Sequence, residues 1–152
     1  MKHNEIVRVT KLFSFDMAHA LEGYDGPCRH IHGHTYHLSV TILGRIMCEE
    51  GHPKNGMVMD FSDFKKIVNE QVVRQFDHAL VLSKHSPLAQ LVAFNKQYNN
   101  VIYTEYQPSC ENLLIDFKER ISFHLPEPLI LQTIRLDETP TSYAEWHRGD
   151  NL

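Results

Sequence analysis

Apolar and polar residues alternate along two stretches near the N-terminus, and each alternation predicts a β-strand with one buried face. The first predicted strand covers residues 5–19 and the second covers residues 33–46. Every second position of the first stretch is apolar or aromatic at Phe13, Phe15 and Met17, and His19 continues the series. The second stretch has the same period at Tyr36, Leu38, Val40 and Ile42. Since alternate side chains of a strand share one face, His19 is predicted at the end of an apolar face.

Apolar residues spaced three and four positions apart predict two amphipathic helices further along the chain. The first helix is expected to begin after Asp60, a plausible N-cap, and to fade near Phe76. Its apolar positions are Phe61, Phe64, Ile67, Val68 and Val72. The second is expected to begin after Ser109 and to end before Pro126. Its apolar positions are Leu113, Leu114, Phe117 and Ile121.

The rest of the chain predicts two more strands, at residues 129–136 and 142–146. Residues 83–107 are less regular, with a short helix at 88–92 and a strand or extended link at 101–106. The order strand, strand, helix, helix, strand, strand indicates an α+β domain whose antiparallel sheet is covered on one side by two helices. All 152 residues fit one domain, because no internal repeat or boundary divides them.

Composition narrows the function classes. With 15 basic and 19 acidic residues, a net charge of −4 and no basic run, nucleic-acid binding is not expected. No apolar stretch reaches the roughly 18 residues of a transmembrane helix, and residues 1–5 lack the apolar core of a signal peptide. Three cysteines without a CxxC pair are typical of reduced thiols in a cytoplasmic protein. The 11 histidines point to metal binding or proton transfer.

Three histidines and a cysteine lie within residues 28–34, a density of metal ligands that neither core nor solvated surface explains. His32 and His34 are two residues apart on a strand, so both imidazoles point to the same face. If the two predicted strands pair antiparallel, His19 lies across from them. Three neutral histidines suit zinc and leave a fourth position for water or substrate, as in catalytic zinc sites. The alternative is a group of exposed histidines near a loop.

Cys28, four residues before His32, has two interpretations that its spacing does not separate. It can be a fourth zinc ligand in a closed site, or a thiolate beside the metal that serves as a base. A packed, inert thiol is a third and weaker interpretation, because Pro27 and Arg29 do not resemble core residues.

Asp77 and His78 follow the first predicted helix directly. Such a pair suits proton transfer, since the carboxylate can orient the imidazole. The alternative is a histidine that interacts with the helix dipole. On residue type alone, Glu138 is a solvated strand end and Ser109 a helix cap.

Six motifs in the same order make the chain similar to one family, the 6-pyruvoyltetrahydropterin synthase superfamily, and within it to the bacterial 6-carboxytetrahydropterin synthases. The resemblance covers most of the chain. In this sequence the motifs are residues 13–19 (FSFDMAH), 28–36 (CRHIHGHTY), 56–61 (GMVMDF), 76–80 (FDHAL), 108–112 (PSCEN) and 136–139 (LDET). No single motif is specific, but the ordered set is.

The resemblance implies a role for each candidate residue. It implies that zinc is bound by His19, His32 and His34, and that Cys28 is the general base and not a ligand. Asp77 and His78 would complete the proton relay. Glu138 would recognise the pterin and also take part in the relay, and Ser109 and Glu111 are weaker candidates for the same pocket. Chemistry agrees for Glu138, because one carboxylate can accept both parallel N–H donors of a 2-amino-4-oxopyrimidine ring.

The substrate that the resemblance implies is 7,8-dihydroneopterin triphosphate. The product would be 6-carboxy-5,6,7,8-tetrahydropterin, an intermediate of queuosine and other 7-deazapurines, with loss of acetaldehyde and triphosphate. The alternatives are triphosphate elimination alone, giving 6-pyruvoyltetrahydropterin, and a non-catalytic pterin- or purine-binding protein.

The resemblance also implies a tunnelling fold (T-fold), in which the sheets of several copies join into a barrel, usually a hexamer with pockets between subunits. Such joining would satisfy the free edges of a four-stranded sheet. The chain departs from the family at Cys110, where Ser or Thr is usual, and in residues 84–106, which exceed the length of the shortest members.

Overall fold

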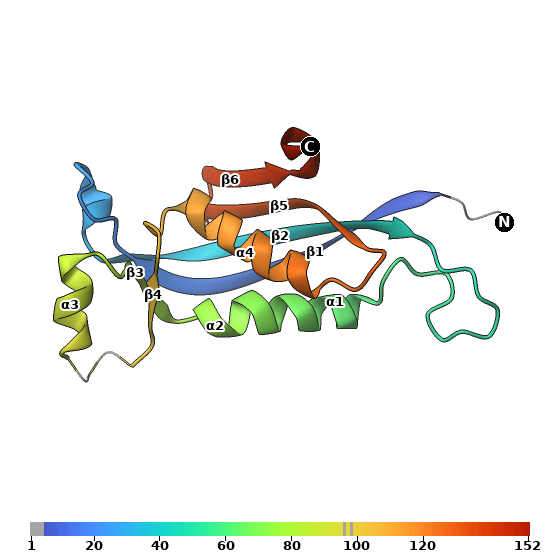
Figure 1. The fold of residues 1–152 in the computed structure, drawn as a ribbon, viewed down its shortest axis with the longest axis horizontal. Helices are drawn as coiled ribbons and strands as arrows, with labels where there is room; N and C mark the ends of the chain where they lie inside the picture. Colours follow the sequence, from blue (N-terminus) through green and yellow to red (C-terminus); the bar gives the residue numbers. More distant parts are fainter. Residues whose placement is uncertain (1–4, 96, 98) are drawn as a thin grey trace.

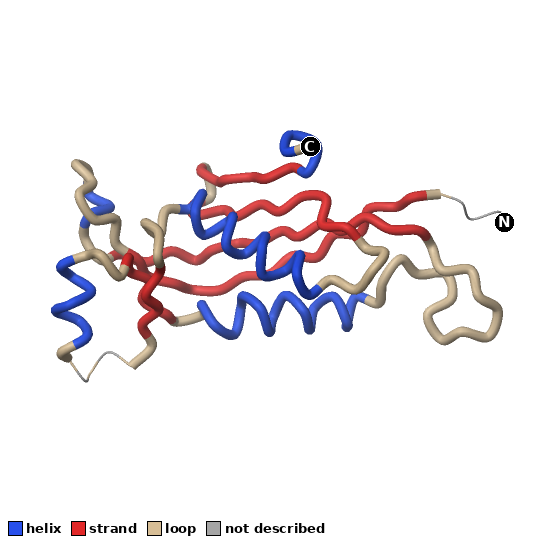
Figure 2. The backbone as a smooth tube through the Cα atoms, in the orientation of Figure 1, coloured by secondary structure: helices blue, strands red, loops and turns tan. Residues whose placement is uncertain are grey.

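A single sheet forms the frame of the molecule in this computed structural model, which describes residues 5–95, 97 and 99–152 (Figures 1 and 2). Within these residues the sheet has six strands in the order β4-β3-β1-β2-β5-β6. The strands are β1 (Ile6–His19), β2 (His32–Arg45), β3 (Ala79–Ser83), β4 (Val101–Thr104), β5 (Ile130–Thr139) and β6 (Ser142–His147). Residues 1–4, which belong to the segment predicted not to be a signal peptide, lie outside the described residues, as do residues 96 and 98 of the irregular stretch.

The predicted pairing of the two N-terminal strands is confirmed. β1 and β2 are antiparallel along their whole length, with His19 opposite His32 and Met17 opposite His34. Odd-numbered residues of β1 and even-numbered residues of β2 are buried over the half of the sheet that includes Phe15 and Tyr36. This alternation gives the sheet one covered face and one uncovered face.

Helices cover one face of the sheet (Figure 1). They are α1 (Phe61–Val68), the π-helical segment η2 (Asn69–Val73), α2 (Arg74–Phe76) and α4 (Cys110–His124). Both predicted N-caps are correct, since the side chain of Asp60 accepts a hydrogen bond from Ser62 N–H and that of Ser109 from Asn112 N–H. The first predicted helix ends at Phe76 as expected. Its middle is a π-helical turn that the apolar spacing did not reveal.

The sheet is mixed, so the prediction of a four-stranded antiparallel sheet was wrong in this respect. β3 pairs in parallel with β1, and β4 pairs in parallel with β3. β3 was missed because its residues are buried without alternation, as is usual for parallel strands. The short helix α3 (Pro87–Ala93) confirms the one expected in the irregular stretch, and its Ala89 and Val92 pack on Leu82 in a second small core.

The uncovered face of the sheet is largely polar. Thr10, Ser14 and Asp16 of β1 are exposed there, next to Thr35 and His37 of β2. His37 therefore points away from the other two histidines of its strand, as its parity predicted. None of the described helices is long and apolar enough to cross a membrane.

Candidate metal centre

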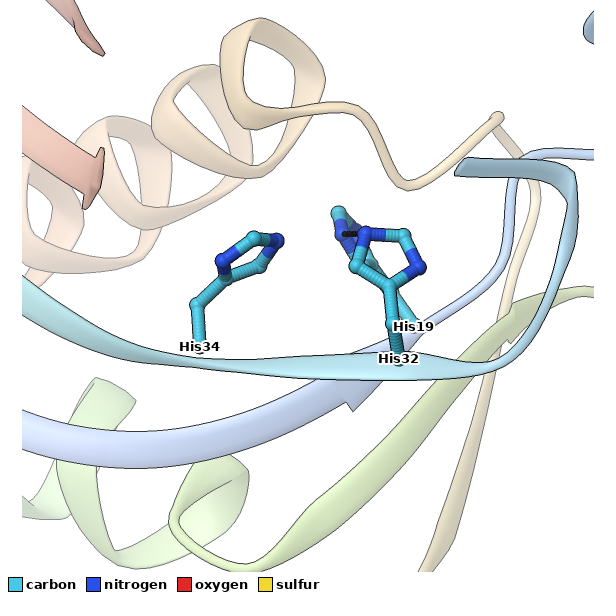
Figure 3. Close-up of side chains that lie close together, drawn as sticks. All are labelled: His19, His32 and His34. Carbon is cyan, nitrogen blue, oxygen red and sulfur yellow. Dashed lines mark hydrogen bonds between the residues drawn. The ribbon is translucent and has the colours of Figure 1, made fainter. Parts of the chain in front are cut away.

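The side chains of His19, His32 and His34 converge on the covered face, below the segment that leads into α4 (Figure 3). Ring centroids are 4.6 Å apart for His19 and His32, 4.9 Å for His32 and His34, and 5.4 Å for His19 and His34. One nitrogen of each ring lies within 4.8 Å of the other two. The predicted juxtaposition of these three residues is present, and one ion can contact all three rings.

Main-chain carbonyls orient two of the rings. His19 Nδ1 lies 2.7 Å from Pro108 O, and His32 Nδ1 lies 2.8 Å from His30 O. Since a carbonyl oxygen only accepts, both Nδ1 atoms carry the proton, and Nε2 of each neutral ring is left as an acceptor. The two Nε2 atoms face each other at 3.1 Å. This arrangement matches the outer-shell hydrogen bonding of metal-binding histidines.

The electrostatics of the centre favour neutral imidazoles. Burial lowers the pKa of His19 and of His34, and the charge of Glu138 opposes part of this effect on both. His34 Nε2 is buried, and none of the described residues hydrogen-bonds to it. Metal ions bind the neutral form of histidine, so the three residues fit a divalent ion such as zinc.

A cavity of about 370 Å³ contains the predicted thiol and pterin-binding candidates together. Its lining includes Cys28, Ser109, Cys110, Glu111 and Glu138. Cys28 is half-buried and does not belong to the group of mutually close metal ligands. The geometry therefore favours a free thiol near the centre over a fourth ligand.

Glu138 connects this cavity to the metal centre. Its Oε1 is 3.6 Å from His34 Nε2, and its Oε2 is 3.5 Å from the hydroxyl of Tyr36. The register of β5 with β6 shifts between Asp137 and Thr139, so Glu138 has no partner on β6. Such irregularities commonly redirect a side chain beside an active site. Glu138 is more than the solvated strand end that its residue type suggested.

Two neighbours of Glu138 were not assigned a role from the sequence. Tyr36 is fully buried, and burial raises the pKa of its hydroxyl above the ordinary range, with a further contribution from Glu138. The buried series of the second strand placed Tyr36 in the core but gave no sign of this contact. Burial, assisted by the charge of Glu138, raises the pKa of Cys110 to about 12. The protonated Cys110 thiol donates to Leu136 O at 3.3 Å, a bond that a Ser or Thr hydroxyl can also make.

Asp77 and His78 form the predicted pair, with Asp77 Oδ1 3.0 Å from His78 Nδ1. Asp16 holds both residues through its main chain: its N–H donates to Asp77 Oδ1 at 2.9 Å, and its carbonyl accepts from His78 N–H at 2.6 Å. His78 has a φ of +60°, the left-handed region that non-glycine residues rarely adopt. Its side chain is 76% exposed.

The pair is not in the cavity that contains Cys28. His78 instead lines a depression with Asp16, Ala18, Gly33 and Thr35, which have the parity of the uncovered face. Met17, His34 and Ala79 also line this depression, so it reaches the edge of the three-histidine group. Within a single chain Cys28 and the Asp77–His78 pair thus line different cavities, and their common role in a relay stays a prediction. The reason is topological. β3 begins at Ala79 beside Met17, so residues 77 and 78 come next to Asp16 of β1. Side-chain atoms of Asp16, Asp77 and His78 lie within 4.8 Å of one another, and Asp16 has the parity opposite to that of His19.

Comparisons with known proteins agree with this fold. The sequence model of the family described as 6-pyruvoyl tetrahydropterin synthase matches residues 8–149. A relative from Haemophilus influenzae, named 6-carboxy-5,6,7,8-tetrahydropterin synthase, is 36% identical over 91% of this chain and 97% of its own length. A protein of the same name from Rickettsia bellii is 29% identical over 92% and 99% of the two chains.

The fold has solved counterparts. The structure of Caenorhabditis elegans 6-pyruvoyl tetrahydropterin synthase superposes with a TM-score of 0.71 at 23% identity, covering 97% of this chain and 99% of that one. The matched residues 8–149 contain the three histidines, Cys28, the Asp77–His78 pair and Glu138. The chain therefore belongs to the 6-pyruvoyl tetrahydropterin synthase family, a family of lyases.

Proposed function

We propose that this lyase converts 7,8-dihydroneopterin triphosphate to 6-carboxy-5,6,7,8-tetrahydropterin, with release of acetaldehyde and triphosphate, and that zinc is its metal. One observation carries the proposal: three histidines, each with a ring nitrogen within 4.8 Å of the other two, stand beside a cavity that holds a free thiol and a carboxylate. The full-length relatives named for the carboxy product support this choice over the pyruvoyl product. The product would feed queuosine and 7-deazapurine synthesis in the cytoplasm, a location that three free thiols fit.

In this reaction each candidate residue would have a role that fits its position in the site. Glu138 would accept the 2-amino and ring N–H donors of the pterin with its two oxygens. Ser109 and Glu111 line the same cavity and would contact the ring or its side chain. Cys28 would remove a proton from the substrate side chain as general base. Zinc held by His19, His32 and His34 would supply Lewis-acid polarisation of the side-chain oxygens.

The Asp77–His78 pair would act together with a second copy of the chain. Since it stands on the uncovered face, we infer that it acts in a pocket of a neighbouring subunit. β4 and β6 are the edge strands of the sheet, and joining of edges into a barrel would bring uncovered faces together. The family resemblance favours a hexamer.

Incubation of the purified, metal-loaded protein with 7,8-dihydroneopterin triphosphate tests the proposal. We expect equal amounts of acetaldehyde, triphosphate and the 6-carboxy product, measured by mass spectrometry and an aldehyde-coupled assay. A pyruvoyl product without acetaldehyde would refute the carboxy assignment. Binding of pterin without any turnover would instead identify a pterin-binding protein.

A further inference from the structure

The loop that carries Cys28, residues 20–31, is joined to the segment before α4 by one side chain. Oε1 of Gln107 accepts a hydrogen bond from Glu22 N–H at 3.2 Å, and Nε2 of the same amide donates to Glu22 O at 2.6 Å. Because a carboxamide is planar and both of its ends are used, this reciprocal pair fixes the direction of the loop as well as its distance.

The neighbouring residue transmits this constraint to Cys28. Leu21 N–H, next to the bonded Glu22, donates to Cys28 O at 2.9 Å. Cys28 itself lies in η1 (Pro27–Arg29), a single 3-10 turn that ends three residues before His32. The backbone of the thiol is therefore two hydrogen-bonded steps from the Gln107 amide.

Gln107 is well anchored on its own side. Its carbonyl accepts from Ser109 N–H at 2.8 Å and from Asn112 Nδ2 at 2.9 Å, which ties it to the start of α4. The next residue is Pro108, whose carbonyl orients His19 at 2.7 Å. One short segment thus contacts both the metal centre and the loop of the thiol.

We propose that Gln107 is a positioning residue that sets where the Cys28 thiol stands relative to the three-histidine centre. Its effect on turnover rests on the proposed function, since it acts through Cys28. Its effect on the loop does not, because the hydrogen bonds are independent of any reaction. The two effects can be measured separately.

The test is Gln107→Ala, which removes both hydrogen bonds and adds no bulk. We expect kcat to fall about tenfold, with KM within about twofold, from the loss of two hydrogen bonds. Metal content should stay at the wild-type value. Alkylation of Cys28 by iodoacetamide, followed by peptide mass spectrometry, should accelerate several-fold as the loop opens locally. Cys48, exposed in the loop after β2, is the internal reference and should not change.

Gln75→Ala is the matched control. Gln75 also makes two hydrogen bonds, to Glu70 O at 2.9 Å and from Arg120 Nη1 at 2.8 Å, but in α2. It should leave kcat and Cys28 alkylation unchanged. Gln107→Glu keeps the acceptor but turns a carboxylate oxygen toward Glu22 O, the partner of the lost donor. Its kcat should therefore be no higher than that of Gln107→Ala, and its Cys28 alkylation no slower.

The proposal is overturned if Gln107→Ala leaves kcat and Cys28 alkylation at wild-type values. Equal acceleration at Cys28 and Cys48 also overturns it, because that result means general loosening. If the wild-type protein releases no acetaldehyde, the proposed function fails, and the ratio of the two alkylation rates still decides the role of Gln107.

Discussion

The three-histidine centre and the Asp77–His78 pair stand on opposite faces of one sheet. In the centre His19 is buried and the other two histidines are half-buried, and main-chain carbonyls fix two of the rings. The pair is exposed, and its histidine has a left-handed backbone. A metal site gains from rigidity and exclusion of water, whereas a group that serves another subunit has to be reachable from outside its own chain. This difference is what we expect if, as proposed above, the pair completes the site of a neighbouring subunit.

Loss of the metal centre should have the largest effect. In His34→Ala we expect loss of bound zinc and a fall in turnover of more than about a thousandfold, since a Lewis acid contributes several kcal/mol. Elemental analysis and acetaldehyde release measure this. His37→Ala, on the same strand but the uncovered face, is the control and should keep its metal. Full metal content in His34→Ala would contradict a three-histidine centre.

The variant Cys28→Ala distinguishes a Cys28 that is a general base from a Cys28 that is a zinc ligand. We expect normal zinc content together with a loss of turnover of about 10²–10⁴-fold, the usual contribution of a general base. If the variant loses its zinc, Cys28 is a ligand and the site is closed.

The variant His78→Ala tests the exposed Asp77–His78 pair. Turnover should again fall about 10²–10⁴-fold with zinc retained, because the proton-transfer group is removed. Mixing this variant with Cys28→Ala during refolding should restore activity to about one quarter of the sites, since random assembly combines an intact Cys28 with an intact neighbouring His78. Absence of restored activity in the mixed assemblies would place both residues in the same chain's pocket.

The smallest expected effect is on the stability of the metal-free protein. Burial lowers the pKa of His19 and His34 from 6.5 in the folded state, so the unfolded chain binds protons first as the pH falls. The free energy of unfolding should therefore be constant above about pH 7 and decrease as the pH drops below 6.5. Urea titrations between pH 8 and 5 measure this. A flat profile would show that the two rings are not desolvated.

Local sequence patterns predicted the convergence of the three histidines well and the position of the exposed pair poorly. Strand parity was enough to bring His19, His32 and His34 together, because antiparallel pairing of adjacent strands leaves few registers. The position of Asp77 and His78 depends on β3, whose buried parallel pairing has no alternation to detect.

Residue patterns do not predict main-chain contacts or the paths of loops. The carbonyls of Pro108 and His30 orient two rings, yet any residue type offers a carbonyl. The contact of Gln107 with the Cys28 loop could not be predicted either, since a polar residue before a proline is common in turns. In contrast, the caps Asp60 and Ser109 were predictable because their side chains act within three residues of themselves.

The left-handed backbone of His78 also implies a trade-off between stability and activity. Glycine adopts this conformation freely, whereas a side chain there costs about 1–2 kcal/mol. Selection for folding alone would favour glycine at this position, and His78→Gly is expected to melt higher than His78→Ala while remaining inactive. Engineering for higher thermal stability should therefore leave residue 78 unchanged and place stabilising substitutions elsewhere in the chain.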